Sequence, residues 1–317
     1  MPKFPPDVRI VEVGPRDGLQ NEAVAVPTQA KIVFIKALSQ AGLKHIEAGS
    51  FVHPKLVPQL ADAEAVFEGL AGHLGSTYSA LTPNERGLDR AIAAGVRRIA
   101  VFTAASEAFT QKNIGMTVAE SLAAFRNVVA KALEAKMTAR GYISTAFVCP
   151  FEGKMDRSKV RDLALQLVDL GVDEVAISDT IGAAVPTDVL HTVGHVLSIV
   201  PREKIALHFH DTYGTALANV LAGLELGVNT FDSSAGGLGG CPFAPGASGN
   251  LATEDLVYML DGMEIRTGVN AQGVINAASA IAVVLGRPLT SAGWRRTHAA
   301  SAPSAASGKT RKSRQPT

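Results

Sequence analysis

A short apolar run followed by a helix-length amphipathic segment recurs along most of the chain, and this repeat restricts the possible folds more than any other feature. Eight runs have the length and composition of buried strands: residues 8–13, 45–48, 75–81, 98–103, 140–147, 174–178, 205–210 and 230–233. Most are followed by a segment with helical periodicity, as at 27–41, 84–94, 117–135, 157–170, 186–199 and 215–226. Alternating strands and helices predict parallel strands covered by helices. Eight such units in roughly 260 residues predict an α/β fold, a (β/α)8 TIM barrel, with a doubly wound open sheet as the alternative.

Glycine and proline punctuate these units. A glycine stands between a predicted helix and the next predicted strand at four places: Gly42, Gly95, Gly171 and Gly227. We expect each to take the left-handed conformation that commonly ends a helix. Pro27 and Pro186 begin predicted helices, where the missing N–H has no partner to lose.

The pattern divides the chain into four parts. Residues 1–7 are a lead-in, and residues 8–265 form the barrel, which ends with a predicted helix at 253–260. Residues 266–290 are a C-terminal helical extension, with its helix at about 269–285. Residues 291–317 are rich in Ser, Ala, Pro and basic side chains, and we expect them to form a flexible, disordered basic tail.

Composition excludes several classes of protein. The hydrophobic fraction of 47% excludes wholesale disorder. The formal charge is +1, but the tail carries six basic groups and no acid, so the remainder has 24 basic against 29 acidic side chains. A nucleic-acid-binding role is disfavoured because the folded part offers no basic patch, although the tail alone is a possible polyanion adapter. The two cysteines form no disulfide framework, and without an apolar leader or membrane-length segment the expected location is cytoplasmic.

Polar side chains follow the predicted strands at the end where a barrel enzyme carries its active site. His208 and His210 lie two residues apart on one strand, so they share a face that points into the barrel. Asp17 follows the first strand and Asn250 follows the last, which brings both toward the histidines. Two nitrogens and two oxygens suit an octahedral divalent cation, Mg²⁺ or Mn²⁺. One ligand with one structural histidine, or an iron-binding facial triad, are the alternatives.

Further candidates lie at the same end. Arg16 is a permanent cation placed to neutralise a developing oxyanion, or else a surface ion-pair partner. Glu47 and Asp179 follow apolar strands and are candidate acid/base residues or structural partners. The candidate substrate-binding residues are Arg16, Gln20, Ser50 and Thr180.

A glycine-rich loop follows the eighth strand. Its glycines are Gly236, Gly237, Gly239 and Gly240, and Cys241 comes directly after them. We expect a flexible loop that closes over a ligand and brings in the Cys241 thiol as a proton donor or nucleophile. Cys149, within the fifth unit, is expected to be buried and inert.

Together these residues resemble the 3-hydroxy-3-methylglutaryl-CoA lyase family. The resemblance extends over about residues 8–285, and its motifs are VEVGPRDGLQNE (11–22), HFHDTYG (208–214), GLGGCPFA (237–244) and GASGNLATED (246–255). It implies metal-dependent cleavage of a tertiary 3-hydroxyacyl-CoA to acetyl-CoA and acetoacetate, as in leucine degradation, by a homo-oligomer, a dimer. It also implies that the metal ligands are Asp17, His208, His210 and Asn250, with His208 catalytic as well. Arg16 would stabilise the enolate, Cys241 would exchange the proton, and Glu47 and Asp179 would support catalysis.

Two departures from the family pattern concern the acyl group. The chain has Ala235-Gly236 where a Val-Ala pair is expected, and Ala48-Gly49 where a threonine is usual before Ser50. We expect both to trim side chains near the pocket, so a longer 3-alkylglutaryl-CoA or citramalyl-CoA is an alternative substrate. A Claisen-condensing synthase on the same barrel is a weaker alternative, because those enzymes usually have a longer C-terminal extension.

Overall fold

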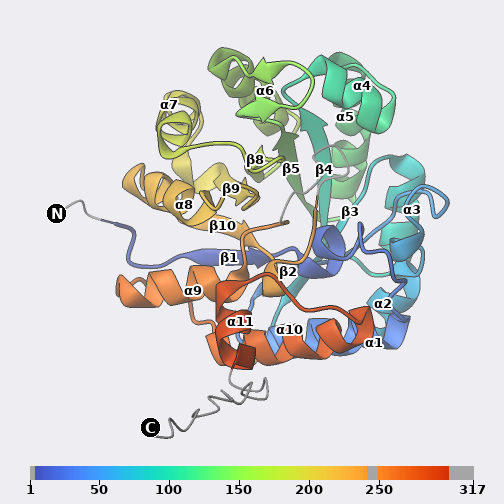
Figure 1. Ribbon diagram of the computed structural model, residues 1–317. Coiled ribbons are helices and arrows are strands. Elements are labelled where there is room, and N and C mark those ends of the chain that lie inside the picture. Colours follow the sequence, from blue (N-terminus) through green and yellow to red (C-terminus); the bar gives the residue numbers. More distant parts are fainter. Residues whose placement is uncertain (1–3, 241–248, 300–317) are drawn as a thin grey trace, which may run out of the picture.

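The computed structural model describes residues 4–240 and 249–299, and there the chain folds into a closed barrel of eight parallel strands surrounded by helices (Figure 1). The strands of the barrel are β1 (Arg9–Glu12), β2 (His45–Ser50), β3 (Thr77–Leu81), β4 (Arg98–Ala104), β5 (Thr138–Ser144), β8 (Glu174–Asp179), β9 (Ile205–Phe209) and β10 (Thr230–Ser233). They lie around the ring in chain order, and β10 pairs with β1 to close it. The predicted barrel is confirmed, and the open sheet is excluded.

Helices follow the strands and cover the outside of the barrel (Figure 1). They are α1 (Thr28–Gln40), α2 (Ala63–Leu70), α3 (Glu85–Ala93), α4 (Glu107–Ile114), α5 (Val118–Glu134), α6 (Arg157–Asp169), α7 (Pro186–Leu197), α8 (Ala216–Glu225), α9 (Thr253–Gly262), α10 (Ala271–Leu285) and α11 (Ala292–Ala299). The predicted helices all form, with ends that differ by a few residues at most. The four predicted capping glycines all have positive φ; at Gly42, a Cβ would also lie 2.2 Å from the carbonyl oxygen of Gly268.

Three elements were not expected from the sequence. Short helices α2 and α4 follow β2 and β4, and a two-stranded antiparallel hairpin of β6 (Val148–Cys149) and β7 (Gly153–Lys154) follows β5. Each lies in a stretch between predicted elements where neither a strand nor a helix was predicted. The hairpin holds Cys149, which is buried and donates its thiol proton to Ser106 Oγ at 3.0 Å.

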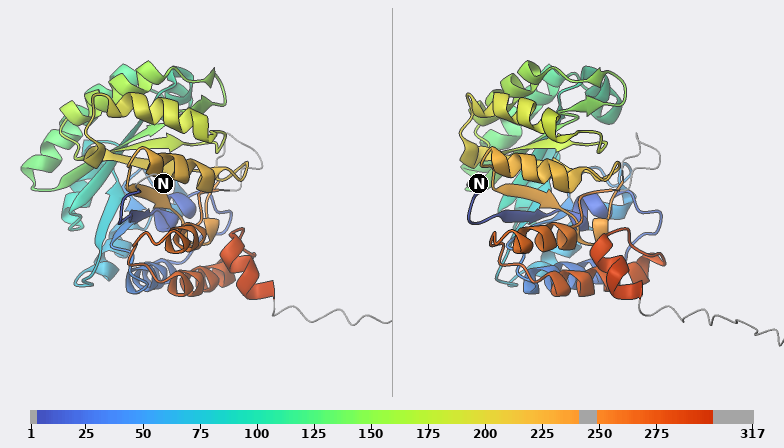
Figure 2. Two further views of the ribbon diagram at one scale, coloured as in Figure 1. Left: turned by 90° about the vertical axis from the view of Figure 1, so that its left-hand side faces the viewer. Right: turned by 60° about the vertical axis from the view of Figure 1, so that its left-hand side comes forward.

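The expectation that residues 291–317 form a flexible tail is wrong for 291–299. Helix α11 packs against α9 and α10 on one side of the barrel (Figure 2). Trp294 donates its indole N–H to Ser279 Oγ at 3.1 Å, and Ser291 donates to the buried Glu254 carboxylate. These tertiary contacts hold a segment whose own sequence carries a weak helix signal. Residues 300–317 lie outside the described residues.

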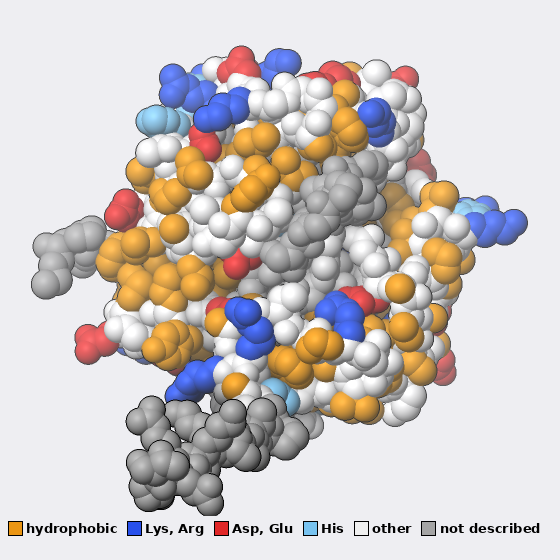
Figure 3. Space-filling model, in the orientation of Figure 1, with side chains coloured by type: hydrophobic (Ala, Val, Ile, Leu, Met, Phe, Trp, Pro, Cys, Tyr) orange, Lys and Arg blue, Asp and Glu red, His pale blue; other side chains and the backbone are white. Residues whose placement is uncertain are grey.

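The space-filling view adds the distribution of charge. In Figure 3, basic side chains lie along the top of the face and in its lower part, while apolar and uncharged side chains cover much of the described surface between them. No helix among the described residues has the length and apolar character needed to span a membrane.

Side chains that alternate along the strands fill the inside of the barrel. One layer is apolar and includes Leu81, Ala100, Tyr142, Ala176 and Ala206. Residues two apart on a strand face the same way. Arg140 therefore lies next to this layer toward the amino end of β5, and His208 lies next to it toward the carboxyl end of β9. The opposite faces of the strands contribute to the large core between barrel and helices. The interior is therefore both packed and charged.

Candidate metal centre and active site

Asp17, His208 and His210 come together at the carboxyl ends of the strands. One potential ligand atom from each lies within 4.8 Å of those of the other two, and both histidines are buried. His208 belongs to β9 and His210 follows it directly. Asp17 lies in η1 (Gly14–Gly18), a π-helical turn after β1. The structure therefore brings together three of the four predicted metal ligands, in a geometry that can hold one cation.

The turn that carries Asp17 depends on close backbone packing. The carbonyl oxygen of Val13 accepts hydrogen bonds from the backbone N–H groups of Arg16, Asp17 and Gly18. A Cβ at Gly14 would lie 2.5 Å from a carboxylate oxygen of Glu12, and a Cβ at Gly18 would lie 2.9 Å from Leu238. The glycines of the motif thus let the turn sit against the chain that follows β10, and the wide π-helical turn projects Arg16 and Asp17 into the barrel mouth.

Asn250, the fourth predicted ligand, lies beside the other three. Its backbone forms an antiparallel bridge with His210, and its Nδ2 donates to Asp17 Oδ2 at 2.8 Å. Its Oδ1 is buried without a hydrogen-bond partner, as is Nδ1 of His210. An unpartnered buried amide oxygen is rare unless a ligand or ion completes it. The donor set therefore fits a divalent cation that accepts oxygen and imidazole ligands.

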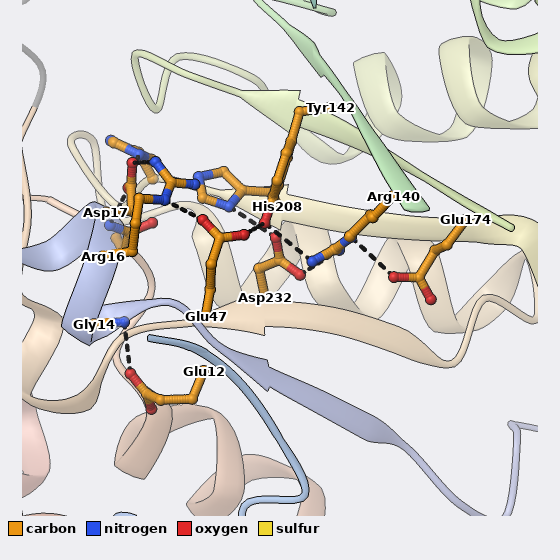
Figure 4. A network of polar contacts seen from close by, with 12 residues as sticks. Glu12, Gly14, Arg16, Asp17, Glu47, Arg140, Tyr142, Glu174, His208 and Asp232 are labelled. Carbon is orange, nitrogen blue, oxygen red and sulfur yellow. Dashed lines mark hydrogen bonds and ion pairs between the residues drawn. The ribbon is translucent and has the colours of Figure 1, made fainter. Parts of the chain in front are cut away.

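Asp232 on β10 fixes the orientation of His208. Its Oδ2 lies 3.1 Å from His208 Nδ1, which leaves Nε2 of the imidazole as the free coordinating atom (Figure 4). Burial alone would raise the pKa of Asp232, but the nearby Arg140 and His208 lower it below its usual value. Asp232 is thus placed to accept a hydrogen bond from Nδ1 of His208, a predicted metal ligand, and this arrangement is common around protein-bound metals.

Arg16 stands next to the predicted metal site and is almost fully buried. Its Nη1 donates to Asp17 Oδ1 at 2.8 Å, and its Nε donates to Glu47 Oε1. Burial alone would raise the pKa of Asp17, but Arg16 and His210 lower it well below its usual range, so Asp17 is an anion. Arg16 is therefore an interior cation held by carboxylates, and the surface ion-pair interpretation is excluded.

Glu47 pairs with two side chains instead of standing free. It accepts from Arg16 on one oxygen and from the Tyr142 hydroxyl on the other, at 2.8 Å for Tyr142. A register shift between Glu47 and Gly49 in the pairing of β2 with β3 bends the strand here. Among the two readings of Glu47 left open by the sequence, these contacts favour a positioning partner of Arg16.

The remaining predicted residues lie at the same end of the barrel in different roles. Gln20 donates to Asp17 Oδ1 at 3.0 Å, so it touches the predicted metal site. Asp179 accepts from the backbone N–H groups of Ala183 and Ala184, and burial raises its pKa. The hydroxyls of Ser50 and Thr180 accept from the backbone N–H groups of Val52 and Thr145, respectively. Substrate contact by Ser50 and Thr180 stays a prediction.

The first part of the glycine-rich loop is anchored. Gly236 donates its N–H to Glu254 Oε2 at 2.9 Å, and both Gly236 and Gly237 are buried with positive φ. A Cβ at Gly239 would lie 2.5 Å from Asn250 Nδ2, so this glycine permits the close approach of Asn250. These glycines are needed for conformation and packing, which differs from the expected lack of order. Gly240 is the last described residue before the gap, and Cys241 lies outside the described residues.

Neither departure from the family motifs opens the barrel interior. A Cβ at Gly49 would meet Ala63 and Phe67 of α2 at 3.6 and 3.7 Å. A Cβ at Gly236 would lie 2.4 Å from Leu289, on the side of the C-terminal segment. Both positions face outward into helix packing, so the expectation that they enlarge the acyl pocket is wrong.

The motifs do not point to three buried side chains that contact the predicted residues. These are Arg140, Tyr142 and Asp232, and all three belong to the network around Glu47 and His208 (Figure 4). The available signal was a charged residue inside an otherwise uncharged buried strand, Arg140 in β5 and Asp232 in β10. Glu12 lies within the first motif but was not among the predicted site residues. It accepts from the Gly14 and Ala235 N–H groups and from Thr253, which connects the turn after β1 to the turn after β10.

Comparison with known proteins gives a consistent family match. The model of the family described as HMGL-like matches residues 7–281. The bovine protein named mitochondrial hydroxymethylglutaryl-CoA lyase is 50% identical over 284 residues, which are 90% of this chain and 87% of the relative. A human relative named cytoplasmic 3-hydroxy-3-methylglutaryl-CoA lyase is 48% identical, over 89% of this chain and 75% of its own length. The names of these relatives thus include both mitochondrial and cytoplasmic locations.

Solved structures agree over the same region. The crystal structure of the Bacillus subtilis HMG-CoA lyase superposes with a TM-score of 0.91 at 47% identity, covering 94% of this chain and 99% of that one. An HMG-CoA lyase from Acinetobacter baumannii, in complex with coenzyme A and 3-methylmalate, gives a TM-score of 0.87 at 41% identity over 96% of this chain and 98% of that one. The carboxyl transferase domain of Rhizobium etli pyruvate carboxylase, at 18% identity and a TM-score of 0.68, shares the fold alone.

Proposed function

The chain belongs to the HMGL-like family, and on that premise we propose that it is a hydroxymethylglutaryl-CoA lyase, which cleaves 3-hydroxy-3-methylglutaryl-CoA to acetyl-CoA and acetoacetate. One observation carries the proposal: Asp17, His208 and His210 converge within 4.8 Å while the buried Arg16 guanidinium touches Asp17. This places a cation-binding cluster and a fixed positive charge side by side. The reaction needs both.

The chemistry follows from the bond that breaks. The tertiary hydroxyl at C3 loses its proton, the C2–C3 electron pair leaves with C2, and C3 becomes the ketone of acetoacetate. The electron pair on C2 is delocalised onto the thioester oxygen as an enolate, which then takes up a proton to become acetyl-CoA. A bound divalent cation would lower the pKa of the substrate hydroxyl and orient the substrate.

Arg16 supplies the second charge. Its guanidinium is held on one side by Glu47 and on another by Asp17, so it need not reorganise when the enolate forms. A preorganised donor of this kind stabilises an oxyanion by about 3 kcal/mol. Glu47 is therefore a positioning residue for Arg16. Asp179 holds the turn after β8 through two backbone N–H groups.

The proton donor to the enolate is assigned to Cys241 from the motif alone. The preceding glycines end beside Asn250, which puts the start of the loop at the predicted metal site. A thiol brought in by that loop would protonate the enolate where water is excluded. Asp179 is a poorer candidate because both of its carboxylate oxygens already accept backbone hydrogen bonds.

The cofactor and partners complete the proposal. Among the described residues the donor set is two imidazoles with carboxylate and amide oxygens and without a thiolate, which favours Mg²⁺ or Mn²⁺. The substrate is an acyl-CoA, in keeping with the coenzyme A bound by the Acinetobacter relative. A dimeric assembly and a cytoplasmic location stay predictions, the first open to analytical ultracentrifugation and the second to cell fractionation.

The decisive experiment measures acetyl-CoA release by the purified chain from 3-hydroxy-3-methylglutaryl-CoA, with Mg²⁺ or Mn²⁺ and with a chelator as control. We expect cleavage that stops in the chelator and returns with the cation. The same assay on longer 3-alkylglutaryl-CoA and citramalyl-CoA ranks the substrates by kcat/KM, and we expect the methylglutaryl thioester to lead. If none of these thioesters is cleaved, the proposed function is wrong.

A further inference from the structure

Arg140 of β5 lies inside the barrel and is 3% exposed. It connects two parts of the site, the residues around His208 and the residues around Arg16. Its Nη2 donates to Asp232 Oδ1 at 2.6 Å, and its Nη1 donates to the Tyr142 hydroxyl at 3.1 Å. Its Nε lies 2.9 Å from Glu174 Oε1, toward the amino end of the barrel (Figure 4). A single rigid guanidinium therefore fixes two neighbours that point toward the site and one that points away.

The first branch leads to the predicted metal ligand His208. Asp232 uses one oxygen for Arg140 and the other for His208 Nδ1. Because both oxygens are engaged, Asp232 cannot rotate without breaking one of the two contacts. The position of Arg140 thus determines the direction in which His208 presents Nε2.

The second branch leads to Arg16. The Tyr142 hydroxyl accepts from Arg140 and donates to Glu47 Oε2, and Glu47 Oε1 accepts from Arg16 Nε. Burial raises the pKa of the Tyr142 hydroxyl, which therefore keeps the proton that it donates to Glu47. The guanidinium groups of both Arg16 and Arg140 also lie near the Tyr142 ring, at 5.7 and 4.8 Å from its centroid. Tyr142 therefore transmits the position of one arginine to the other.

We propose that Arg140 is a positioning residue that couples the cation-binding half of the site to its oxyanion-binding half, through Asp232 and His208 on one side and through Tyr142, Glu47 and Arg16 on the other. The inference rests on the proposed function. The proposal explains why a charged side chain lies at the centre of the barrel. An apolar side chain would pack there equally well and would not carry the desolvation cost of a buried guanidinium. An ion pair that served stability alone would need only Glu174, with which Arg140 already pairs at 2.9 Å.

The two branches make separable predictions. Asp232→Asn keeps the shape of the side chain but weakens the hold on His208, so the affinity for Mn²⁺ should fall by about 10- to 100-fold. Tyr142→Phe removes only the hydroxyl, so the Mn²⁺ affinity should stay within about twofold while kcat at saturating cation falls by about tenfold. Arg140→Lys keeps the charge but loses the planar fork, so it should lower both quantities.

The test measures Mn²⁺ affinity by calorimetry on the cation-free full chain, and kcat and KM on the same preparations. Arg98→Met is the matched control, because Arg98 pairs with Asp173 and Glu174 in the same cluster and has no described contact with Asp232 or Tyr142. It should leave both quantities unchanged. Circular dichroism checks that each variant is folded; if Arg140→Lys is not, the two single-branch variants decide.

Separation of the two effects between Asp232→Asn and Tyr142→Phe supports the inference, as does a combined effect in Arg140→Lys. A folded Arg140→Lys with unchanged Mn²⁺ affinity and kcat overturns it, and so do equal losses of Mn²⁺ affinity in the two single-branch variants. The Mn²⁺ titration needs no turnover. A wild-type chain that binds Mn²⁺ but cleaves no thioester would therefore contradict the proposed function, while the effects of Asp232→Asn and Arg140→Lys on affinity would still decide the inference.

Discussion

The two ends of the barrel hold their buried charges in different ways. At the amino end, Glu174 accepts from Arg9 and pairs with Arg140 and Arg98, while Arg98 also pairs with Asp173. Each charge there faces a charge of opposite sign. At the carboxyl end, Asp17 and Glu47 pair with Arg16, but three further buried carboxylates have no arginine partner. Glu12, Asp179 and Glu254 accept from backbone N–H groups and hydroxyls instead. Burial raises the pKa of each of these three.

The carboxyl end also gathers polar atoms that have no partner. Most of the buried side-chain atoms without a hydrogen bond in the described part of the chain lie there: Thr145 Oγ1, Ser178 Oγ, His210 Nδ1, Thr212 Oγ1, Ser234 Oγ and Asn250 Oδ1. An interior that served only to fold would satisfy these atoms, as the amino end satisfies its charges. The charges at the amino end, which we call the complete end, pair with one another. The polar atoms at the carboxyl end, the incomplete end, need a ligand as their partner.

The largest effect should come from removing a charge at the incomplete end. Asp17→Asn keeps the shape of the side chain but removes the only carboxylate of the predicted metal cluster. We expect kcat to fall by more than about a thousandfold, because the cation and the substrate hydroxyl lose their anchor. Acetyl-CoA release and Mn²⁺ calorimetry measure both losses.

Asp211→Asn is the matched control for this change. Asp211 lies next to His210 in sequence, but its carboxylate accepts from the Ala216 N–H at the start of α8. We expect its kcat to stay within about tenfold of wild type. Equal losses in the two variants would contradict the assignment of Asp17 as the ligand.

At the complete end, the main effect should be on stability. Glu174→Gln leaves Arg9 and Arg140 without a charged partner at that end, and breaking a buried pair lowers the free energy of unfolding by about 3 kcal/mol. The kcat of the folded enzyme should change by less than about threefold, because Asp232 and Tyr142 still hold Arg140. Urea unfolding and steady-state assays separate the two quantities.

Asp173→Asn provides the comparison for Glu174→Gln. Its side chain is 46% exposed and pairs with Arg98, so the free energy of unfolding should fall by about 0.5 kcal/mol. If Glu174→Gln abolished activity in folded protein without lowering stability, the contrast between the two ends would not hold.

The buried carboxylates without an arginine partner predict that stability depends on pH with the opposite sign to that expected for an ion-paired acid. Burial raises the pKa of Glu12 to about 7 from its ordinary value of 4.5. Between these pH values the folded protein binds more protons than the unfolded chain, so stability falls as the pH rises through this window and levels off above it. The loss attributable to Glu12 is about 3 kcal/mol.

Glu12→Gln cannot titrate and should lack that loss. With a chelator present to remove any contribution from cation binding, urea unfolding of wild type and variant at pH 5 and pH 8 gives two differences in free energy. From pH 5 to pH 8, the free energy of unfolding of the wild type should fall by about 3 kcal/mol relative to that of Glu12→Gln. An identical difference at both would show that Glu12 keeps its ordinary ionisation in the folded state.

The parts of this comparison that sequence could predict follow from local rules. Strand and helix periods predict the barrel, and a parallel barrel brings its carboxyl strand ends together, so Asp17, His208 and His210 were expected to meet. The pairing of Arg140 with Asp232 and Tyr142 was not, because it depends on how strands stagger around the ring. β5 carries Arg140 and β10 carries Asp232, and β8 and β9 lie between these two strands in the ring. No local pattern encodes which interior side chains reach each other.

Helix α11, on the outside of the barrel, was also not predicted because it depends on contacts between distant parts of the chain. Its sequence is short, basic and poor in apolar residues, which is typical of a solvated tail. It is ordered by groups far away in the chain: Asp255 accepts from the N–H groups of Ala292 and Gly293, and Glu254 accepts from Ser291. Tertiary contacts therefore override a weak local propensity.

The smallest expected effect tests whether that helix reaches the incomplete end. Ser291 is buried and donates to Glu254, whose other oxygen accepts from Gly236 in the first part of the glycine-rich loop. Ser291→Ala should lower the free energy of unfolding by about 1.5 kcal/mol, because a buried carboxylate loses a donor, and should lower kcat by less than about threefold. Thr297→Ala, a hydroxyl on the same helix that only donates to its own backbone at Gly293, should change neither. Glu254 has no described arginine partner that could replace a lost donor. A change in Ser291→Ala as small as that in Thr297→Ala would therefore mean that the carboxyl end does not depend on such hydroxyl donors.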